Sequence, residues 1–485
     1  MRPATRRYFL VALLVVVIAS IAIAGPRTIK RLGLFEPEPF SWSSFLDERS
    51  RQSATRNWKS VVKKGPLATQ KALAKAIRTN AIDKGSYIAF QAISDDPKTR
   101  AAFQRYLSEL DTADHRSAII GLYDTLMRAP PNKDILFDKL SRHLKGTIAK
   151  ADQNPGHNGR FMGWALATGV YASLIAYDRT GDIRFMREAN LALMAALKLR
   201  DDTTGRIDEV RGRIVKGWGG NKYDSEGRHM TNFTLAGRVA FVLALFADTV
   251  ERHPELQSKY ADQAKKFLNA ARETMDDYSG EFFVVGDMGY YKRPIHNDIE
   301  PLNHMAWAGN ALILLNKHTG DGSYGQMAEQ LARFFKQSMR HDNGTVWWPY
   351  QPAKTEDATR PEYIWKASLT SQFMIFAWQN GVVFTGSDMQ AIANTILSRV
   401  FRPEGRISAL MGGPFENLAT FKMLYGDYLS VTPFIAFGCV NPNVREKIET
   451  LVASRPDIGG WMRGTYGVIA YAQRLQGSHH CESTS

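Results

Sequence analysis

Apolar residues recur at helical spacing along most of the chain, and apolar and amphipathic stretches follow one another in pairs. Each amphipathic stretch begins with an aromatic residue, carries alanines and large apolar residues on one face, and ends in a charged turn that contains Gly. This pattern predicts a series of helical hairpins. The three clearest pairs are residues 161–182 with 185–207, 230–250 with 260–282, and 302–321 with 324–346.

The hairpins repeat with a period of roughly 60 to 70 residues, which is typical of a repeat architecture. Two further pairs are 363–381 with 388–401 and 428–437 with 443–454, and a last apolar helix covers 460–475. Pairing an apolar helix with an amphipathic one predicts two concentric layers with the apolar helices inside. We therefore predict an all-α fold, an (α/α) toroid of about five to six helical hairpins.

The domain organisation follows from these boundaries. The toroid takes residues 154–476, and a strongly charged region of helical pattern, residues 45–153, forms an N-terminal helical extension. We expect residues 477–485 to form a flexible tail.

The two kinds of connection between helices differ in length. Links from apolar to amphipathic helices are a few residues, as in the repeated triplets Thr180-Gly181-Asp182 and Thr319-Gly320-Asp321. Links from amphipathic to apolar helices reach roughly 20 to 30 residues, and long connections in a compact domain usually carry function. We expect all the long connections to lie at one rim, where the inner helices begin.

Aromatic residues are concentrated in these long connections. Flat amphipathic rings stack on sugar rings, so they predict a carbohydrate-binding cleft. We expect about half of the rings to fix loops to helix ends instead. The candidate substrate-binding aromatics are Trp218, Tyr223, Tyr290, Trp348 and Tyr350.

Groups able to transfer protons or hold anions lie in the same connections. Proton abstraction at C5 of a uronic acid requires that the substrate carboxylate is neutralised and that a base lies beside the proton. Asn303 and His304 open an inner helix, whose dipole assists neutralisation, and Tyr291 or His229 is then the base. The same residues have a structural interpretation, with His304 in the core and Asn303 as a helix cap. The remaining candidates are Glu356 as a catalytic residue and Arg293, Glu300, Asp357 and Arg360 as substrate-binding residues.

Two other functions remain open. A glycoside hydrolase would use two carboxylates about 5 to 10 Å apart, here Glu300 with Glu356 or Asp357. A non-catalytic polysaccharide-binding or assembly scaffold would need no such pair. The sequence contains no zinc-peptidase, phosphate-loop, dinucleotide or GxSxG motif, and its histidines lack metal-ligand spacing, so we expect no metal and no cofactor.

The N-terminus has the pattern of an export signal. Arg2, Arg6 and Arg7 precede an apolar run, residues 8–25, that ends in the small residues typical of a cleavage site. Residues 1–25 are either a signal peptide or a signal anchor, and residues 26–44 form a linker. We expect a protein outside the cytoplasm, periplasmic, and anchored to the inner membrane if residues 1–24 are not removed.

The charge favours an acidic partner. The formal net charge is +14, and without residues 1–24 the chain keeps 59 basic against 48 acidic residues, or +11. For an exported chain without nucleic-acid motifs, an acidic polysaccharide is the expected partner rather than nucleic acid. The two cysteines, Cys439 and Cys481, allow one disulfide, and free thiols fit equally well.

The block PLNHMAWAGNALILLNKHTGDGSYGQMAEQLARFFKQSM, residues 301–339, resembles α/α-toroid carbohydrate-active proteins. The nearest resemblance is to the C-terminal domain of glucuronyl C5-epimerases and related bacterial helical-barrel proteins, with polysaccharide lyases further off. It covers about residues 155–475 and implies action on uronate polymers by C5 proton abstraction, as an epimerase or lyase. Related bacterial sequences have Glu-Asp followed by Ser-His, whereas this chain keeps Glu356 and Asp357 but has Thr359 and Arg360.

Overall fold

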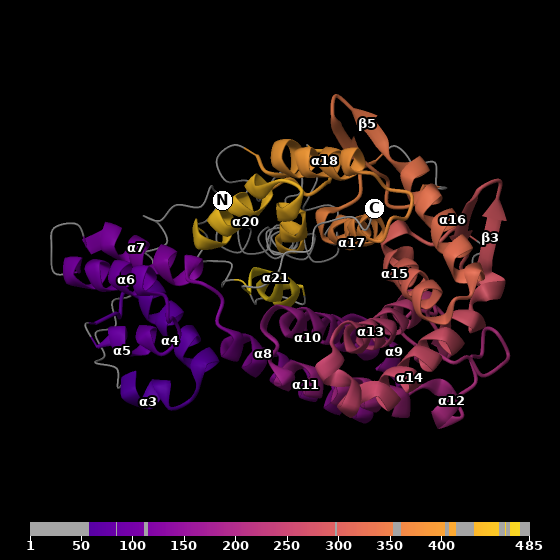
Figure 1. The fold of residues 1–485 in the computed structure, drawn as a ribbon, viewed down its shortest axis with the longest axis horizontal. Helices are drawn as coiled ribbons and strands as arrows, with labels where there is room; N and C mark the ends of the chain where they lie inside the picture. Colours follow the sequence, from indigo (N-terminus) through magenta and orange to yellow (C-terminus); the bar gives the residue numbers. More distant parts are fainter. Residues whose placement is uncertain are drawn as a thin grey trace, which may run out of the picture.

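The chain folds into a two-layered ring of helices with a smaller helical lobe beside it (Figure 1). This computed structural model describes residues 58–83, 85–110, 115–295, 298–352, 360–402, 407–413, 431–454, 461 and 466–475. Within those residues helices dominate, and the strands form only short two-stranded hairpins. The expected all-α toroid is confirmed.

Six helical elements of the described chain form the inner layer, and each contacts the next around a closed ring. This arrangement follows from sequence because these elements are the most apolar, and a helix that is apolar on all sides must be covered on all sides. In ring order they are α10 (Ala167–Thr180) with the π-helical turn η2 (Phe161–Leu166) before it, α13 (Phe233–Arg252), α15 (Leu302–Thr319), α17 (Ile364–Gln379), the 3₁₀ helix η6 (Thr432–Cys439) and α21 (Gly467–Arg474).

The amphipathic helices form the outer layer, with their apolar faces on the inner helices. One of them, α8, lies in the segment that we assigned to the N-terminal extension, yet it packs against η2, α10, α11 and α21. The outer helices are α8 (Lys133–Gln153), α11 (Ile183–Lys198), α14 (Pro254–Asp277), α16 (Gly322–Ser338), α18 (Gly386–Thr395) with η4 (Ile396–Val400), and α20 (Pro442–Ser454).

The repeated Thr-Gly-Asp triplet explains the short links. Gly181 and Gly320 end α10 and α15 in the left-handed region, with φ of 64° and 69°, where a glycine carries no steric penalty. The Asp that follows each glycine caps the next helix by accepting a hydrogen bond from a backbone N–H. One helix therefore stops and the next one starts within three residues.

Helix α13 is the centre of the core. Every residue from Phe233 to Val250 is buried, and Gly237 lets the helix approach α15, because a Cβ there would lie 2.7 Å from the Cβ of Ala308. In the part of the chain that the structure describes, α13 alone is long and apolar enough to cross a membrane, and its apolar window is fully buried inside the ring.

The N-terminal lobe packs against the ring chiefly where α4 meets α8 and α7 meets α20. It appears in indigo and violet beside the ring in Figure 1. Its helices are α3 (Trp58–Val62), α4 (Pro66–Arg78), α5 (Ser86–Gln91), α6 (Pro97–Glu109) and α7 (His115–Arg128).

The long connections contain short helical turns and antiparallel two-stranded hairpins. The hairpin of β5 and β6 turns through Asn343 and Gly344, both at positive φ, as a type I′ two-residue turn requires. These elements are η1 (Pro155–His157), α9 (Asn158–Arg160), α12 (Asp201–Thr204), β1 (Gly219–Gly220) with β2 (Met230–Thr231), η3 (Ser279–Glu281), β3 (Phe282–Val285) with β4 (Met288–Tyr291), and β5 (Arg340–Asp342) with β6 (Thr345–Trp347).

Candidate active site

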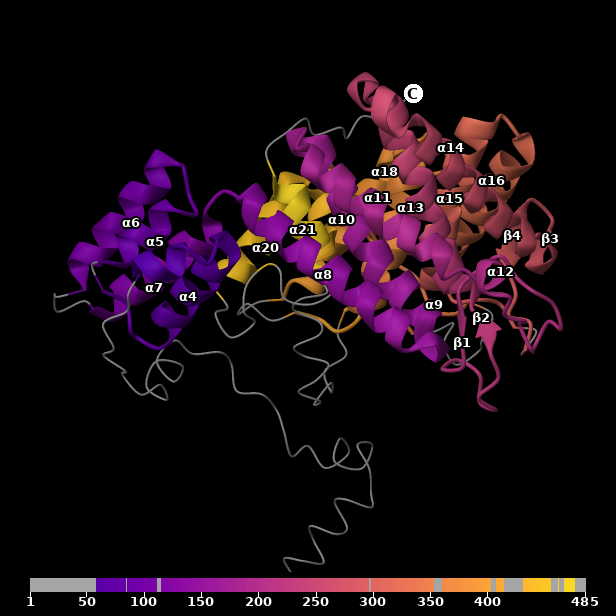
Figure 2. The ribbon, with the colours of Figure 1, turned by 90° about the horizontal axis from the view of Figure 1, so that it is seen from below.

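The long connections meet at the end of the ring where the inner helices begin, which we name the connector rim. The Leu302 N–H donates to the Tyr350 carbonyl (3.2 Å), which joins the connections before α15 and α17. The Asn221 N–H donates to the Gly156 carbonyl (3.0 Å), which joins those before α13 and α10. Figure 2 shows α9, α12, β1 and β2 gathered on one side of the ring. The expected candidate residues therefore share one rim where the structure describes them.

His304 and Glu300 form a hydrogen-bonded pair at the start of α15. Nδ1 of His304 lies 2.9 Å from a carboxylate oxygen of Glu300, whose side chain is only 2% exposed, while that of His304 is 23% exposed. Among the described residues Nε2 of His304 has no hydrogen-bond partner. A histidine oriented by a buried carboxylate, with its second nitrogen available, is suited to general acid-base catalysis.

Asn303 lies beside this pair but does not cap its helix. Pro301 occupies the N-cap position, and no side chain accepts a capping hydrogen bond there. Asn303 is buried, and its side-chain oxygen has no partner. It precedes Trp307 by four residues, so both lie on one face of α15.

Tyr350, Trp365 and Lys366 lie on the α17 side of the same rim. The rings of His304 and Tyr350 meet edge to face with centroids 6.2 Å apart, and Nζ of Lys366 lies 3.2 Å from the centroid of Tyr350. Trp365, on the first turn of α17, is 37% exposed and 5.1 Å from the Lys366 amine. The rim thus combines a proton-transfer pair with a cation and an exposed ring.

Glu362 is a buried acid in the connection before α17. One carboxylate oxygen accepts hydrogen bonds from Trp348 Nε1 and Thr370 Oγ1, both at 2.7 Å, and the other has no partner. Burial raises the pKa of Glu362 to about 8, although its two hydrogen bonds and the Lys366 charge act in the opposite direction. Sequence reasoning missed this residue, because nothing in the sequence marks which acid of a loop is buried.

Arg238 and Trp164 form a second feature at this rim that sequence reasoning missed. The Arg238 guanidinium lies between two indoles, 4.6 Å from the ring centroid of Trp164 and 3.8 Å from that of Trp307. Trp164 Nε1 donates to the hydroxyl of Tyr223 (3.0 Å), a residue that is 42% exposed. The available signal in the sequence is a single arginine inside the otherwise apolar stretch from Phe233 to Ala247.

The two predicted anion-binding arginines also lie at the connector rim. Nε of Arg293 is 2.6 Å from Asp298, so its charge is already paired. The Arg360 guanidinium lies 4.5 Å from the ring centroid of Tyr363.

The structure differs from the sequence prediction at four aromatic residues. Trp218 is fully buried and donates Nε1 to the Ala196 carbonyl (2.7 Å), so it fixes its loop to α11. Trp348 is fully buried against Glu362. Tyr291 is buried and stacked on Phe233, and burial raises its pKa far above the usual range, so it is not placed as a base. Tyr290 packs on Phe334 of the outer helix α16. These aromatic side chains fix the loops to the helices, because burying their apolar surface is favourable.

His229 forms its hydrogen bonds with Asp201 and Glu209 rather than with residues near His304. Its Nε2 lies 2.7 Å from a carboxylate oxygen of the buried Asp201, the first residue of α12. Its backbone N–H donates to Glu209 (2.6 Å). The structure therefore does not bring His229 together with His304. The predicted residues Glu356 and Asp357 lie outside the described residues.

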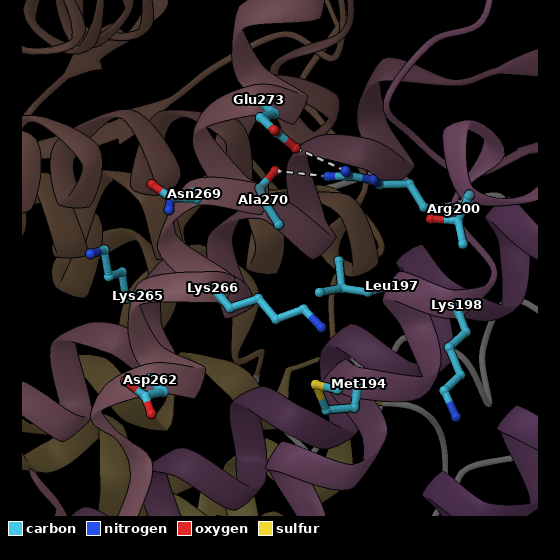
Figure 3. Close-up of a pocket in the computed structure, with 11 residues that line it drawn as sticks. Met194, Leu197, Lys198, Arg200, Asp262, Lys265, Lys266, Asn269, Ala270 and Glu273 are labelled. Carbon is cyan, nitrogen blue, oxygen red and sulfur yellow. Dashed lines mark hydrogen bonds and ion pairs between the residues drawn. The ribbon is translucent and has the colours of Figure 1, made fainter.

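A groove of about 560 Å³ lies on the outer wall between α11 and α14 (Figure 3). Arg200 is paired there with Glu273 (2.8 Å) and Asp202 (2.7 Å). Asp262 and the lysines Lys198, Lys265 and Lys266 also line it, together with the apolar Met194, Leu197 and Ala270. No histidine is among the described residues that line this groove, so the pair of His304 and Glu300 at the connector rim is the better candidate for proton transfer. No group of three or more possible metal ligands gathers in the described part of the chain.

No family model matches the chain, and no curated protein matches it. Among solved structures, the chain is similar to an inactive variant of the α-1,6-mannanase GH76A of Salegentibacter sp. HEL1_6 in complex with α-1,6-mannotetrose, with 11% identity, a TM-score of 0.42, and 71% of this chain and 99% of that chain covered. A second inactive variant, in complex with α-1,6-mannotriose, gives 11% identity, a TM-score of 0.41, and coverage of 71% and 100%. With TM-scores below 0.5, the toroid rests on the helix packing of this chain.

Proposed function

We propose that this chain is a carbohydrate-active enzyme that binds an acidic polysaccharide at the connector rim and transfers a proton through His304. The observation that carries the proposal is the pair of His304 and buried Glu300, with Nε2 of His304 lacking a partner. The exposed rings of Tyr223 and Trp365 support carbohydrate binding, because sugars stack on such faces.

The electrostatics of the rim favour an acidic polymer. The N-termini of the inner helices lie there, and each carries a partial positive charge. Lys366, Arg293, Arg360 and Arg238 add cationic side chains on or beneath the rim. The signal peptide or signal anchor expected at residues 1–25 is consistent with this proposal, because acidic polysaccharides occur outside the cytoplasm.

The favoured reaction is proton abstraction at C5 of a uronate. His304 is the base, Glu300 holds its ring in position, and cations at the rim stabilise the charge that develops on the substrate carboxylate. Delivery of a proton from solvent to the opposite face of C5 gives epimerisation. If instead the C4–O bond breaks as a C4–C5 double bond forms, and the leaving oxygen takes a proton, the product is that of a lyase.

Hydrolysis is the second candidate reaction. Glu300 is bonded to His304 and almost fully buried, so it is poorly placed as an acid on a glycosidic oxygen. Glu362 has the protonation state that a general acid needs, because its pKa of about 8 keeps the carboxyl protonated near neutrality, but it is fully buried as well and would have to be uncovered to reach a glycosidic oxygen. Its second carboxylate would come from outside the described residues.

The products distinguish the reactions on a panel of uronate and neutral polysaccharides. A lyase yields unsaturated ends that absorb in the ultraviolet, an epimerase exchanges the C5 hydrogen with solvent, and a hydrolase releases reducing ends without absorbance. His304→Gln should lower turnover by about two to four orders of magnitude while the melting temperature stays close to that of the wild type.

A matched control is His253→Gln. His253 also pairs with a carboxylate, Asp178 at 2.9 Å, but it lies at the opposite end of the ring. Undiminished turnover in His304→Gln would refute its proposed role. Binding of acidic polysaccharide without any product would instead establish a non-catalytic scaffold.

A further inference from the structure

Arg238 is the buried arginine of the described chain that lacks an acidic partner. Arg200 pairs with Glu273 at 2.8 Å, Arg211 with Asp208 at 2.6 Å, and Arg474 with Glu449 at 3.2 Å. Arg238 is 1% exposed, yet no ion pair joins it to any carboxylate. A buried charge without a counter-ion is costly, and proteins keep one mainly where it has a use.

The hydrogen bonds of Arg238 are incomplete. Nε donates to the Gly163 carbonyl (2.7 Å) and Nη2 to the Thr168 hydroxyl (3.1 Å), both on the neighbouring inner helix. Nη1 is buried and has no partner. The indoles of Trp164 and Trp307 hold the guanidinium plane in place, but they accept no conventional hydrogen bond from its edge. One donor edge of a fixed guanidinium is thus unsatisfied.

This unsatisfied edge lies close to the proposed catalytic pair. Trp307, which Arg238 contacts, follows His304 by three residues, a rise of about 4.5 Å along the helix. Asn303, with its own unsatisfied buried oxygen, lies on the same face of α15 as Trp307. Arg238 therefore contacts α15 about one helical turn after His304.

We propose that Nη1 of Arg238 binds the carboxylate of an acidic sugar and is the residue that makes the site specific for uronates. The inference rests on the proposed function and deepens it by assigning the substrate's charge to one side chain. A charge-assisted hydrogen bond from a desolvated guanidinium discriminates strongly against a neutral sugar, which leaves the donor unpaired.

Trp164 and Tyr223 are the cover over this position. The Trp164 indole lies on one face of Arg238, and its hydrogen bond to Tyr223 extends to a loop residue that is 42% exposed. The inference requires this pair to move aside, so that a sugar can reach Nη1. The uncovered indole then offers a stacking face next to the guanidinium.

The test uses sodium glucuronate and glucose as probes on the full chain, at equal ionic strength set with sodium chloride. Tryptophan fluorescence reports binding, because two indoles touch Arg238. We expect the wild type to prefer glucuronate by about tenfold or more and Arg238→Met to lose this preference. Equal affinity for both probes in the wild type, or an unchanged preference in the variant, overturns the inference.

Arg474→Met is the matched control. Arg474 is also buried and lies 4.2 Å from the ring centroid of Trp461, but it is paired with Glu449, so its loss should lower stability and leave the glucuronate preference intact. If Arg238→Met does not fold, Arg238→Lys keeps the charge but lacks the second nitrogen, and the same loss is expected. A crystal structure of the wild type with glucuronate needs no variant: a carboxylate bonded to Nη1 supports the inference, and a sugar bound elsewhere refutes it.

The result separates this inference from the proposed function. Turnover of an acidic polysaccharide with an Arg238-independent preference refutes the inference alone. Arg238-dependent glucuronate binding without turnover of any polysaccharide refutes the enzymatic proposal alone.

Discussion

The two ends of the ring differ in how fully their polar side chains are paired. At the end where the inner helices stop, here named the turn rim, Asp248 pairs with Arg252, Lys317 and His318 at 2.7 to 3.0 Å. Asp178 extends the network to Arg252 at 3.0 Å. At the connector rim, the Nε2 of His304, the oxygen of Asn303 and Nη1 of Arg238 have no partners.

This difference shows where the fold gains stability and where it keeps groups for binding. Cations at helix C-termini, with a buried carboxylate between them, stabilise the turn rim. Unsatisfied buried groups at the connector rim cost stability, and such groups mark functional sites. Changes at the turn rim should therefore affect folding, and changes at the connector rim should affect binding and turnover.

The largest effect on stability is expected from Asp248→Asn. Removing the charge leaves three cations around a buried amide, which should lower the free energy of unfolding by about 3 kcal/mol. Urea denaturation measures the loss, and turnover per folded molecule should match the wild type. A large loss of turnover with normal stability would contradict the division between the rims.

A smaller effect is expected from Trp218→Phe, which tests a ring of the connector loops that we now regard as structural. The variant loses the hydrogen bond to the Ala196 carbonyl and part of a fully buried side chain, at a cost of about 2 kcal/mol. Affinity for polysaccharide, measured by isothermal titration calorimetry, should stay within about twofold of the wild type. A selective loss of affinity would return Trp218 to the binding site.

The smallest effect is a pH dependence from His318. Burial opposes its charge, but Asp248 and Glu251 outweigh burial and raise the pKa of His318 above its ordinary value. The stabilisation from protonated His318 is complete below about pH 6.5 and is lost as the pH rises through the folded pKa. We expect the free energy of unfolding to fall as the pH rises from about 6.5 through the folded pKa of His318. His318→Asn should remove this slope, and a slope that persists would show that another group titrates.

The sequence predicted the helical hairpins because their causes are local. Apolar spacing, a glycine at a left-handed C-terminus and an aspartate cap are all visible in a few residues, as at Gly181 and Asp182. The sequence did not show that α8 joins the outer layer of the ring, because its charged pattern resembles that of the lobe before it. Which helix covers another is decided by packing across the ring.

The candidate site was predicted only in part. His304, Glu300 and Tyr350 lie together as expected, since they belong to connections that meet at one rim. The orientation of the aromatic side chains was not predictable. Trp218 and Tyr223 lie only five residues apart in one loop, yet Trp218 is buried and Tyr223 is 42% exposed. Arg238 was visible in the sequence, but its missing counter-ion is a property of three-dimensional packing.

The π-helical turn η2 has a further consequence for the history of this site. A wider turn contains one residue more than a regular helix, and such insertions shift every later side chain around the axis. Here the widened turn includes Gly163, whose carbonyl accepts from Arg238, and Trp164, which covers it. Deleting one residue between 161 and 166 would restore regular α-helical winding. The Gly163 carbonyl would then accept a backbone hydrogen bond within the helix in place of the one from Arg238. The surroundings of Arg238 thus depend on a single inserted residue, a change small enough for related toroids to gain or lose in one step.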